Sequence, residues 1–296
     1  MAVNYASKFS TLLDERFALG SLTEALINHN YDWVGVETVK VFSNKLVTPG
    51  DYTITGSNRY GSPAELENEV QELQMIKDRA FTYTIDKKSE QDTMGTLTAV
   101  KTLAENINLV MIPEIDKYRI LILAANVPTS GTHSSQSHIV TATVTKANAY
   151  EEFLKVQERL DNDYAPQGGR ICICTPAFHN FLKLDANFTK SGDMATRIAI
   201  NGQVGEVDGV PIVKVPTNYF PANVDFIITN PMVAPAPVKL QEFKIHDDAP
   251  GISGSLVEVR YRFDCFAMKN KKDALGMHTS VAPTENAPIA VDPHNS

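Results

Sequence analysis

The longest periodic pattern of apolar residues in the chain begins shortly after Asp92. Its apolar positions recur in alternating steps of three and four residues, the spacing of one face of an α-helix. This predicts an amphipathic helix of about 20 residues, roughly 30 Å long. Pro113 is expected to kink or end the helix because proline lacks an amide hydrogen, after which the pattern resumes towards Ala125. The apolar positions are Leu97, Val100, Ala104, Ile107 and Met111, followed by Ile115, Tyr118 and Ile122.

Residues 36–42, 78–86 and 256–268 instead have the composition or the two-residue alternation of β-strands. If the first two strands pair, about 35 residues between them project as a hairpin, each arm reaching at most roughly 55 Å. A compact chain of this size has a radius of gyration of about 19 Å, so this excursion needs a partner. In the third strand one face is expected to be buried and the other to be wet or to lie against a neighbour. The buried face carries Val257, Val259, Tyr261, Phe263 and Cys265, and the other Glu258, Arg260, Arg262 and Asp264.

Shorter patterns complete a mixed α+β body. A second helix is predicted over 147–162, and a short helix begins at Pro176 after a buried strand at 170–175. The Asp208-Gly209 pair between apolar runs predicts a tight hairpin turn. Further strands are predicted at 223–229 and 241–246, an exposed loop at 189–205 and a mobile tail at 279–296, whereas residues 5–26 form an arm that must dock on this chain or on a neighbour.

Composition narrows the class of protein. The 296 residues carry a net charge of −8, which argues against a surface that grips nucleic acid through its phosphates. No stretch approaches the roughly 18 apolar residues of a membrane span, and the N-terminus has no apolar leader, so the protein is expected to be soluble and made in the cytoplasm. The three cysteines, Cys172, Cys174 and Cys265, are expected to be buried and reduced.

The sequence carries almost no sign of catalytic or metal-binding chemistry. It has no glycine-rich nucleotide loop, no His-Glu-x-x-His and no Gly-x-Ser-x-Gly. His133 and His138 are interpreted as surface-loop residues, and His179 as a packed helix residue rather than a general base. The acidic run Glu65, Glu67, Glu69 and Glu72 fits a solvated strand or a fraying helix. We therefore expect no catalytic, cofactor or metal site, and the projecting elements favour an assembly subunit over an enzyme.

The order of these elements resembles the major capsid proteins of tailed bacteriophages with the Hong Kong 97 fold. The resemblance rests on an ordered set of segments that together span most of the chain up to about Met277. They are residues 5–17 (YASKFSTLLDERF), 51–61 (DYTITGSNRYG), 81–86 (FTYTID), 112–119 (IPEIDKYR) and 205–216 (GEVDGVPIVKVP).

The resemblance implies an α+β capsid fold with a particular division of the chain. Its parts would be an N-terminal arm, an extended hairpin called the E-loop with its flanking strands, a peripheral domain with a long spine helix, an axial domain, peripheral return strands and a flexible C-terminal tail. The corresponding residues are 1–38, 39–85, 86–170, 171–233, 234–278 and 279–296.

The resemblance also implies contacts, partners and location. The chain would assemble through pentamers and hexamers into an icosahedral shell that encloses phage DNA without reading its sequence. It would be made in the host bacterial cytoplasm and end in the virion, with a separate scaffolding protein, a portal and a possible decoration protein as partners, and no membrane. An encapsulin-like compartment is the alternative. The expected subunit contacts are Asp51, Tyr52, Asn58, Arg59, Tyr60 and Glu65 in the E-loop, Lys190, Asp193 and Arg197 in the axial loop, and Phe9, Arg16 and Phe17 in the arm.

Overall fold

The structure is a computed structural model that describes residues 21–28, 30–31, 38–45, 47, 49–63, 65–92, 99–185, 205–247, 249–281 and 292–294. The chain divides into two compact units. One, the hairpin unit, consists of residues 33–75, and the other, the body, contains the rest of the chain. Each unit is described by itself below.

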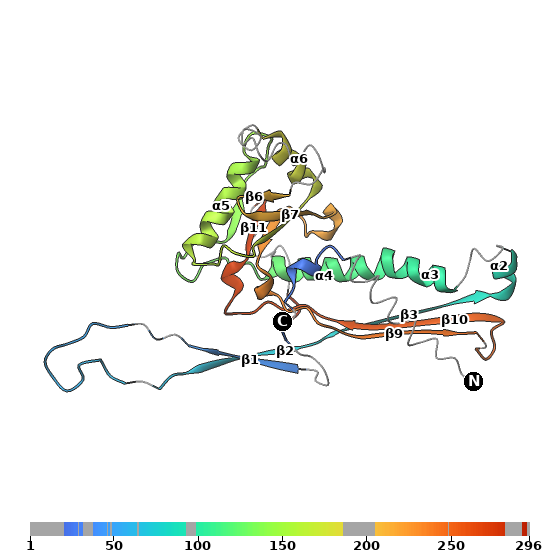
Figure 1. Ribbon diagram of the computed structural model, residues 1–296, viewed down its shortest axis with the longest axis horizontal. Coiled ribbons are helices and arrows are strands. Elements are labelled where there is room, and N and C mark those ends of the chain that lie inside the picture. Colours follow the sequence, from blue (N-terminus) through green and yellow to red (C-terminus); the bar gives the residue numbers. More distant parts are fainter. Residues whose placement is uncertain are drawn as a thin grey trace. The chain divides into compact units, whose positions relative to one another are not determined.

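The hairpin unit is a two-stranded antiparallel ribbon with a long connecting loop (Figure 1). Strand β1 (Thr38–Asn44) pairs with β2 (Asn68–Gln74), so that Phe42 lies opposite Val70. The pairing of the first strand with residues 78–86, which the sequence patterning left as a condition, does not occur. The acidic run supplies the partner strand instead, and its exposed Glu67 and Glu72 form cross-strand ion pairs with Lys45 and Lys40.

The strand predicted at 78–86 is β3 (Lys77–Asp86), which belongs to a three-stranded antiparallel sheet in the body. Its neighbour is the central strand β10 (Gly254–Phe263), which also pairs with β9 (Val238–His246). The expected alternation of β10 is confirmed for its apolar face, since Val257, Val259, Tyr261 and Phe263 are all buried. Asp264, which the pattern placed on the face expected to be wet or to lie against a neighbour, is instead buried within this chain just beyond the end of β10. It accepts hydrogen bonds there, as described below.

A long helix covers the apolar face of this sheet, and the two run side by side in Figure 1. It consists of α3 (Ala99–Asn106), a π-helical turn η2 (Ile107–Met111) and α4 (Ile112–Ala125) without a break. Pro113 neither ends nor restarts the helix: it lies in the first turn of α4, where the wider π-turn before it tolerates the missing amide hydrogen. The buried helix residues that pack against the sheet are Leu103, Ile107, Met111, Ile112 and Ile115.

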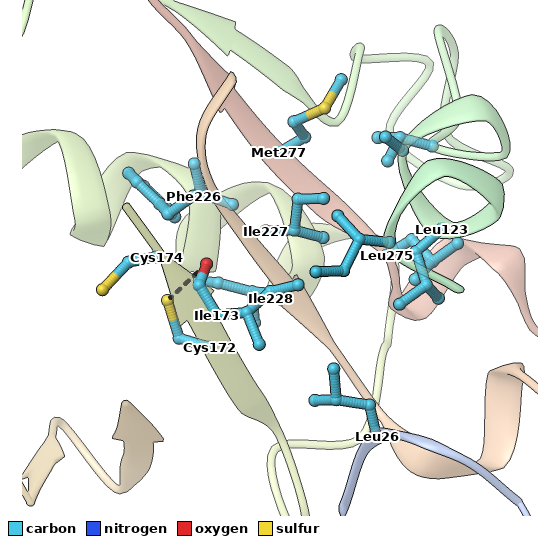
Figure 2. Packing of buried hydrophobic residues seen from close by; sticks show 14 of the residues in the cluster. Leu26, Leu123, Cys172, Ile173, Cys174, Phe226, Ile227, Ile228, Leu275 and Met277 are labelled. Carbon is cyan, nitrogen blue, oxygen red and sulfur yellow. Dashed lines mark hydrogen bonds between the residues drawn. The ribbon is translucent and has the colours of Figure 1, made fainter. Parts of the chain in front are cut away.

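The rest of the body is built on a six-stranded sheet with the order β4-β11-β8-β5-β7-β6. Helices α5 (Ala149–Asn162) and α6 (Pro176–Leu184) pack on it. Figure 2 shows the core between these elements, where Phe226, Ile227 and Ile228 of β8 lie beside Ile173. The strands are β4 (Ile139–Thr141), β5 (Ile171–Cys174), β6 (Glu206–Val207), β7 (Val210–Lys214), β8 (Val224–Thr229) and β11 (Gly276–Thr279).

Several local predictions are confirmed in this part of the body. Thr175 caps α6 by accepting a hydrogen bond from the Phe178 amide, and Pro176 begins the helix. The Asp208-Gly209 turn has positive φ at both residues, 50° and 76°, as a tight hairpin between β6 and β7 requires. Cys172, Cys174 and Cys265 are free and buried. The short helices that join the larger elements are α2 (Lys87–Asp92), η1 (Glu24–Leu26), η3 (Thr217–Tyr219), η4 (Pro231–Val233) and η5 (Lys272–Ala274).

Strands β4 and β11 come from segments that sequence patterning alone did not assign to this sheet. Each is short, and β11 pairs in parallel with β4 and antiparallel with β8. The expected boundaries put residues 139–141 and 276–278 with the peripheral elements. Hydrogen bonding instead joins both strands to the sheet that also contains β5, β6, β7 and β8. The proposed domain limits themselves stay predictions.

The end of the N-terminal arm, from Ser21 to Leu26, docks on this chain, whereas residues 5–20 of the arm lie outside the described residues. The Asp116 carboxylate of α4 accepts hydrogen bonds from the Ser21 and Thr23 hydroxyls at 2.6 Å each and from the Leu22 amide at 3.0 Å. Buried Arg119, one turn further on, donates to the Thr23 hydroxyl. Leu26 then enters the core cluster that also contains Leu123 (Figure 2).

Candidate functional site

The loop of the hairpin unit has a defined internal structure despite its exposure. The Thr53 amide donates to the Arg59 carbonyl at 3.1 Å, and the Gly61 amide donates to the Asn58 carbonyl at 3.0 Å. Two glycines take the positive φ values that the bends require, 104° at Gly56 and 86° at Gly61, a backbone conformation that glycine adopts without steric cost. These contacts fold the tip back on itself, so its side chains are displayed from a turn rather than from a fully extended chain.

An aromatic pair stands on this turn. The rings of Tyr52 and Tyr60 meet edge to face with their centroids 5.0 Å apart, and Tyr60 is 93% exposed. Ile54 between them is 79% exposed. Exposed aromatic side chains lose little conformational entropy on binding and contribute much contact area, which is why they are frequent at the centres of protein interfaces. The tip therefore has the chemistry of a surface that binds protein.

Cross-strand ion pairs follow the ribbon below the tip. Lys45 lies 2.8 Å from Glu67, and Lys40 lies 2.6 Å from Glu72. All four side chains are solvent-exposed, so each pair contributes at most about 1 kcal/mol to stability. The ion pairs also favour the observed register of β1 with β2, because a shift by one residue would move the acidic side chains of β2 to the opposite face of the ribbon.

The structure describes six of the twelve side chains expected at subunit contacts, and it finds those six exposed in the hairpin loop: Asp51, Tyr52, Asn58, Arg59, Tyr60 and Glu65. Tyr52, Asn58, Arg59 and Tyr60 are brought together by the turn, and Asp51 precedes it. The three axial-loop residues Lys190, Asp193 and Arg197 and the three arm residues Phe9, Arg16 and Phe17 lie outside the described residues.

The histidines that were considered for chemistry have structural environments. His138 was interpreted as a surface-loop residue, and this is wrong: it is buried against Asp163, a carboxylate too distant in sequence for patterning to detect. His133 remains exposed and contacts the ring of Tyr164. His179 is a packed helix residue as predicted, and burial together with the nearby Lys183 and Lys214 lowers its pKa below the usual value.

Within the described part of the chain no group of three or more histidine, cysteine, aspartate or glutamate side chains is arranged to hold a metal ion. None of the described helices is both long and apolar enough to cross a membrane. Among the described residues, the hairpin tip is the surface on which the expected contact residues gather.

The arrangement of these elements can be compared with known proteins. No protein-family model matches the sequence, and no curated protein sequence matches it significantly. Solved structures do match. A chain from Mycobacterium phage Che8 superposes with a TM-score of 0.67 at 15% identity, covering 86% of this chain and 89% of its own length. A chain from the capsid of cyanophage P-SCSP1u has a TM-score of 0.62 at 11% identity, covering 83% and 84%. A chain from the mature capsid of bacteriophage PhiM1 has a TM-score of 0.62 at 13% identity, covering 85% and 84%.

The chain has the fold of phage capsid proteins. The mixed α+β capsid fold expected from the order of sequence segments is thereby confirmed. Below, the hairpin unit is called the E-loop and the helix from α3 to α4 the spine helix, after the parts that the sequence resemblance implies. The covered shares, above four fifths of both chains in each comparison, show that the likeness extends over most of the molecule rather than over one motif.

Proposed function

We propose that the chain is the major capsid protein of a tailed phage and that many copies assemble into a closed icosahedral shell. The fold shared with chains of phage capsids carries this proposal. The E-loop supports it, because exposed aromatic and aliphatic side chains on an ordered turn are suited to lie against another subunit. Each such contact is modest, but repetition over a closed shell makes assembly strongly cooperative.

The finer parts of the proposal concern partners and location. Pentamers and hexamers would be the building units, with Lys190, Asp193 and Arg197 at the axial contacts and Phe9, Arg16 and Phe17 in arm contacts. A scaffolding protein and a portal would direct closure in the host cytoplasm, and a decoration protein is a further candidate partner. The net charge of −8 favours a shell that encloses DNA without adsorbing it, because like charges repel.

Deleting the E-loop tip tests the function. The full chain is expected to form closed particles or capsomers by negative-stain electron microscopy and light scattering, with a scaffolding protein supplied if required. A variant lacking residues 50–66, joined by a short glycine-serine linker, is expected to stay folded by circular dichroism but to form no shell. A control variant, Asp208→Asn, changes only an exposed residue in the β6–β7 turn of the body and should assemble normally.

Two results would contradict the proposal. The first is a full chain that remains strictly monomeric across concentration and scaffold addition. The second is a tip deletion that still builds normal particles, which would remove the E-loop from the assembly contacts. Particles that form but carry a bound protein cargo in place of DNA would instead indicate an encapsulin-like compartment.

A further inference from the structure

A single buried carboxylate lies at the junction between the two sheets of the body. Asp264 follows the last residue of β10, is 1% exposed, and accepts four hydrogen bonds. The Tyr118 hydroxyl and the Cys265 amide each donate to Oδ1 at 2.8 Å, and the Ile76 amide donates to Oδ2 at 2.7 Å. The fourth donor is Nε2 of His294, 2.8 Å from Oδ1. A buried carboxylate is stable only when hydrogen bonds or an opposite charge compensate for lost hydration, so each of these donors matters.

The fourth donor comes from the C-terminal end of the chain, which makes further contacts. The Asp292 carboxylate accepts a 2.6 Å hydrogen bond from the Asn126 amide group at the end of α4. The Asp292 side chain also accepts from the His294 amide at 2.9 Å, so the segment has its own turn. The His294 ring packs against Phe266, with centroids 4.6 Å apart. Residues 292–294 therefore bridge α4 and the segment after β10.

These contacts converge where the chain passes from the three-stranded sheet to the six-stranded sheet. The two crossing segments are hydrogen-bonded to each other, from the Asp264 amide to Pro237 and from the Phe266 amide to Pro235. Ile76, the first residue of the body after the hairpin unit, is held at the same carboxylate. Asp264 thus links the start of β3, α4, the crossing segment and the C-terminal residues.

We propose that residues 292–294 form a clasp that keeps this junction closed. Among the four donors to Asp264 within the described residues, His294 is the one whose side chain can carry a positive charge, and it is 16% exposed. Undocking of the clasp would remove that donor and uncover the carboxylate, which weakens the hold of Asp264 on the Ile76 amide. Residues 292–294 were interpreted from sequence as part of a mobile tail. In this proposal they control how firmly Ile76, the residue before β3, is held by Asp264. This inference concerns the single chain and does not depend on the proposed function.

Hydrogen–deuterium exchange of the full-length protein tests the clasp. His294→Ala removes the donor, and Asp292→Ala removes the separate contact with Asn126. Both variants are expected to raise the exchange rate at least tenfold in peptides that contain the amides of Ile76 and Cys265, with no change in peptides from β8. The matched control is His246→Ala, which removes an exposed histidine paired with Glu258 in the three-stranded sheet and should leave the junction peptides unchanged.

The outcomes separate a clasp from a general loss of stability. If exchange at the junction stays within twofold of the wild-type rate in both variants, residues 292–294 do not hold it and the proposal is overturned. A similar increase in every peptide, β8 included, would also overturn it, because the effect would then be global unfolding rather than local release.

Discussion

His138 and Asp163 form a buried pair in which Nε2 of the imidazole contacts Oδ2 of the carboxylate and neither side chain is exposed. The other ring nitrogen, Nδ1, lies 2.9 Å from the carbonyl oxygen of Leu275, just before β11. Asp163 also accepts from the amides of His133 and Ser134 at 2.7 Å each. One carboxylate at the end of α5 thus holds the loop before β4 against the C-terminal strand.

Replacing this carboxylate should destabilise the body strongly. Burial by itself raises the pKa of Asp163, but the hydrogen bonds from His138 and Ser134 and from the His133 amide outweigh it and hold the pKa below the usual value. A lowered pKa stabilises the fold at pH values above the unfolded pKa of about 3.9, and this contribution disappears as the pH falls through the folded pKa. Asp163→Asn is expected to lower the free energy of unfolding by about 3 kcal/mol at pH 7, measured by urea denaturation.

The control for that substitution lies on the same helix. Glu158 is exposed on α5, and Glu158→Gln should change the unfolding free energy by less than about 0.5 kcal/mol. If Asp163→Asn unfolds at the same urea concentration as Glu158→Gln, the buried pair does not contribute to stability.

Tyr60 should affect assembly but not folding. Its ring is almost fully exposed and contacts Tyr52 at the E-loop tip, so Tyr60→Ser is expected to change the unfolding free energy by less than about 0.5 kcal/mol. Because an exposed aromatic side chain suits an interface centre, the same change should lower the yield of particles several-fold by sedimentation analysis. Tyr164→Ser provides the comparison, since Tyr164 is also exposed but lies in the body. Equal particle yields for both variants would argue against a contact at the tip.

Adding a methyl group at Gly276, the first residue of β11, should lower the stability of the body. A Cβ there would lie 2.6 Å from Cγ1 of Val156 and 3.4 Å from the Leu160 side chain, both in α5. Overpacking of this kind typically costs 1–3 kcal/mol, so Gly276→Ala is expected to lower the unfolding free energy by about 2 kcal/mol. Gly205→Ala is the matched control because a Cβ at Gly205 meets no atom within 4 Å. Equal melting temperatures for the two variants would show that α5 can move away from β11 at little cost.

The cysteines should be unreactive in the native protein. Burial raises the pKa of Cys174 to about 12 and that of Cys265 to about 12, and it raises the pKa of Cys172 as well. At pH 8 the thiols are therefore protonated as well as inaccessible, and a thiol-exchange reagent should label them only after unfolding in urea. Ser57→Cys in the exposed loop serves as the positive control and should react at once in the native state. Rapid labelling of the unaltered native chain would show that this core opens.

Patterning along the chain succeeded where a structural feature depends on neighbouring residues. The spine helix follows from apolar steps of three and four, and the buried face of β10 follows from Val257, Val259 and Tyr261 at every second position. The turn at Asp208-Gly209 follows from two residues that accept positive φ. In each case the physical cause lies within a few residues of the effect.

Pairing between distant segments could not be predicted in this way. The strands at 36–42 and 78–86 are both β-forming, and nothing local showed that β1 would take the acidic β2 as partner while β3 joined β10. The same limit explains why the burial of His138 and Asp264 was not predicted. His138 follows a serine-rich loop and Asp264 shares an alternating face with charged residues, so neither was expected in the core. Their partners Asp163, Tyr118 and His294 come from other elements.

The sequence by itself determined the α+β composition, the spine helix, the strand faces and the polar, aromatic character of the E-loop tip, because these depend on local periodicity and residue type. Only the tertiary structure decided which strands pair and that the end of the arm docks on α4. It also brought together His138 with Asp163 next to β11, and His294 with Asp264 after β10. Burial of a polar group is favourable only when a partner is in place, and such partners are brought together by the fold as a whole.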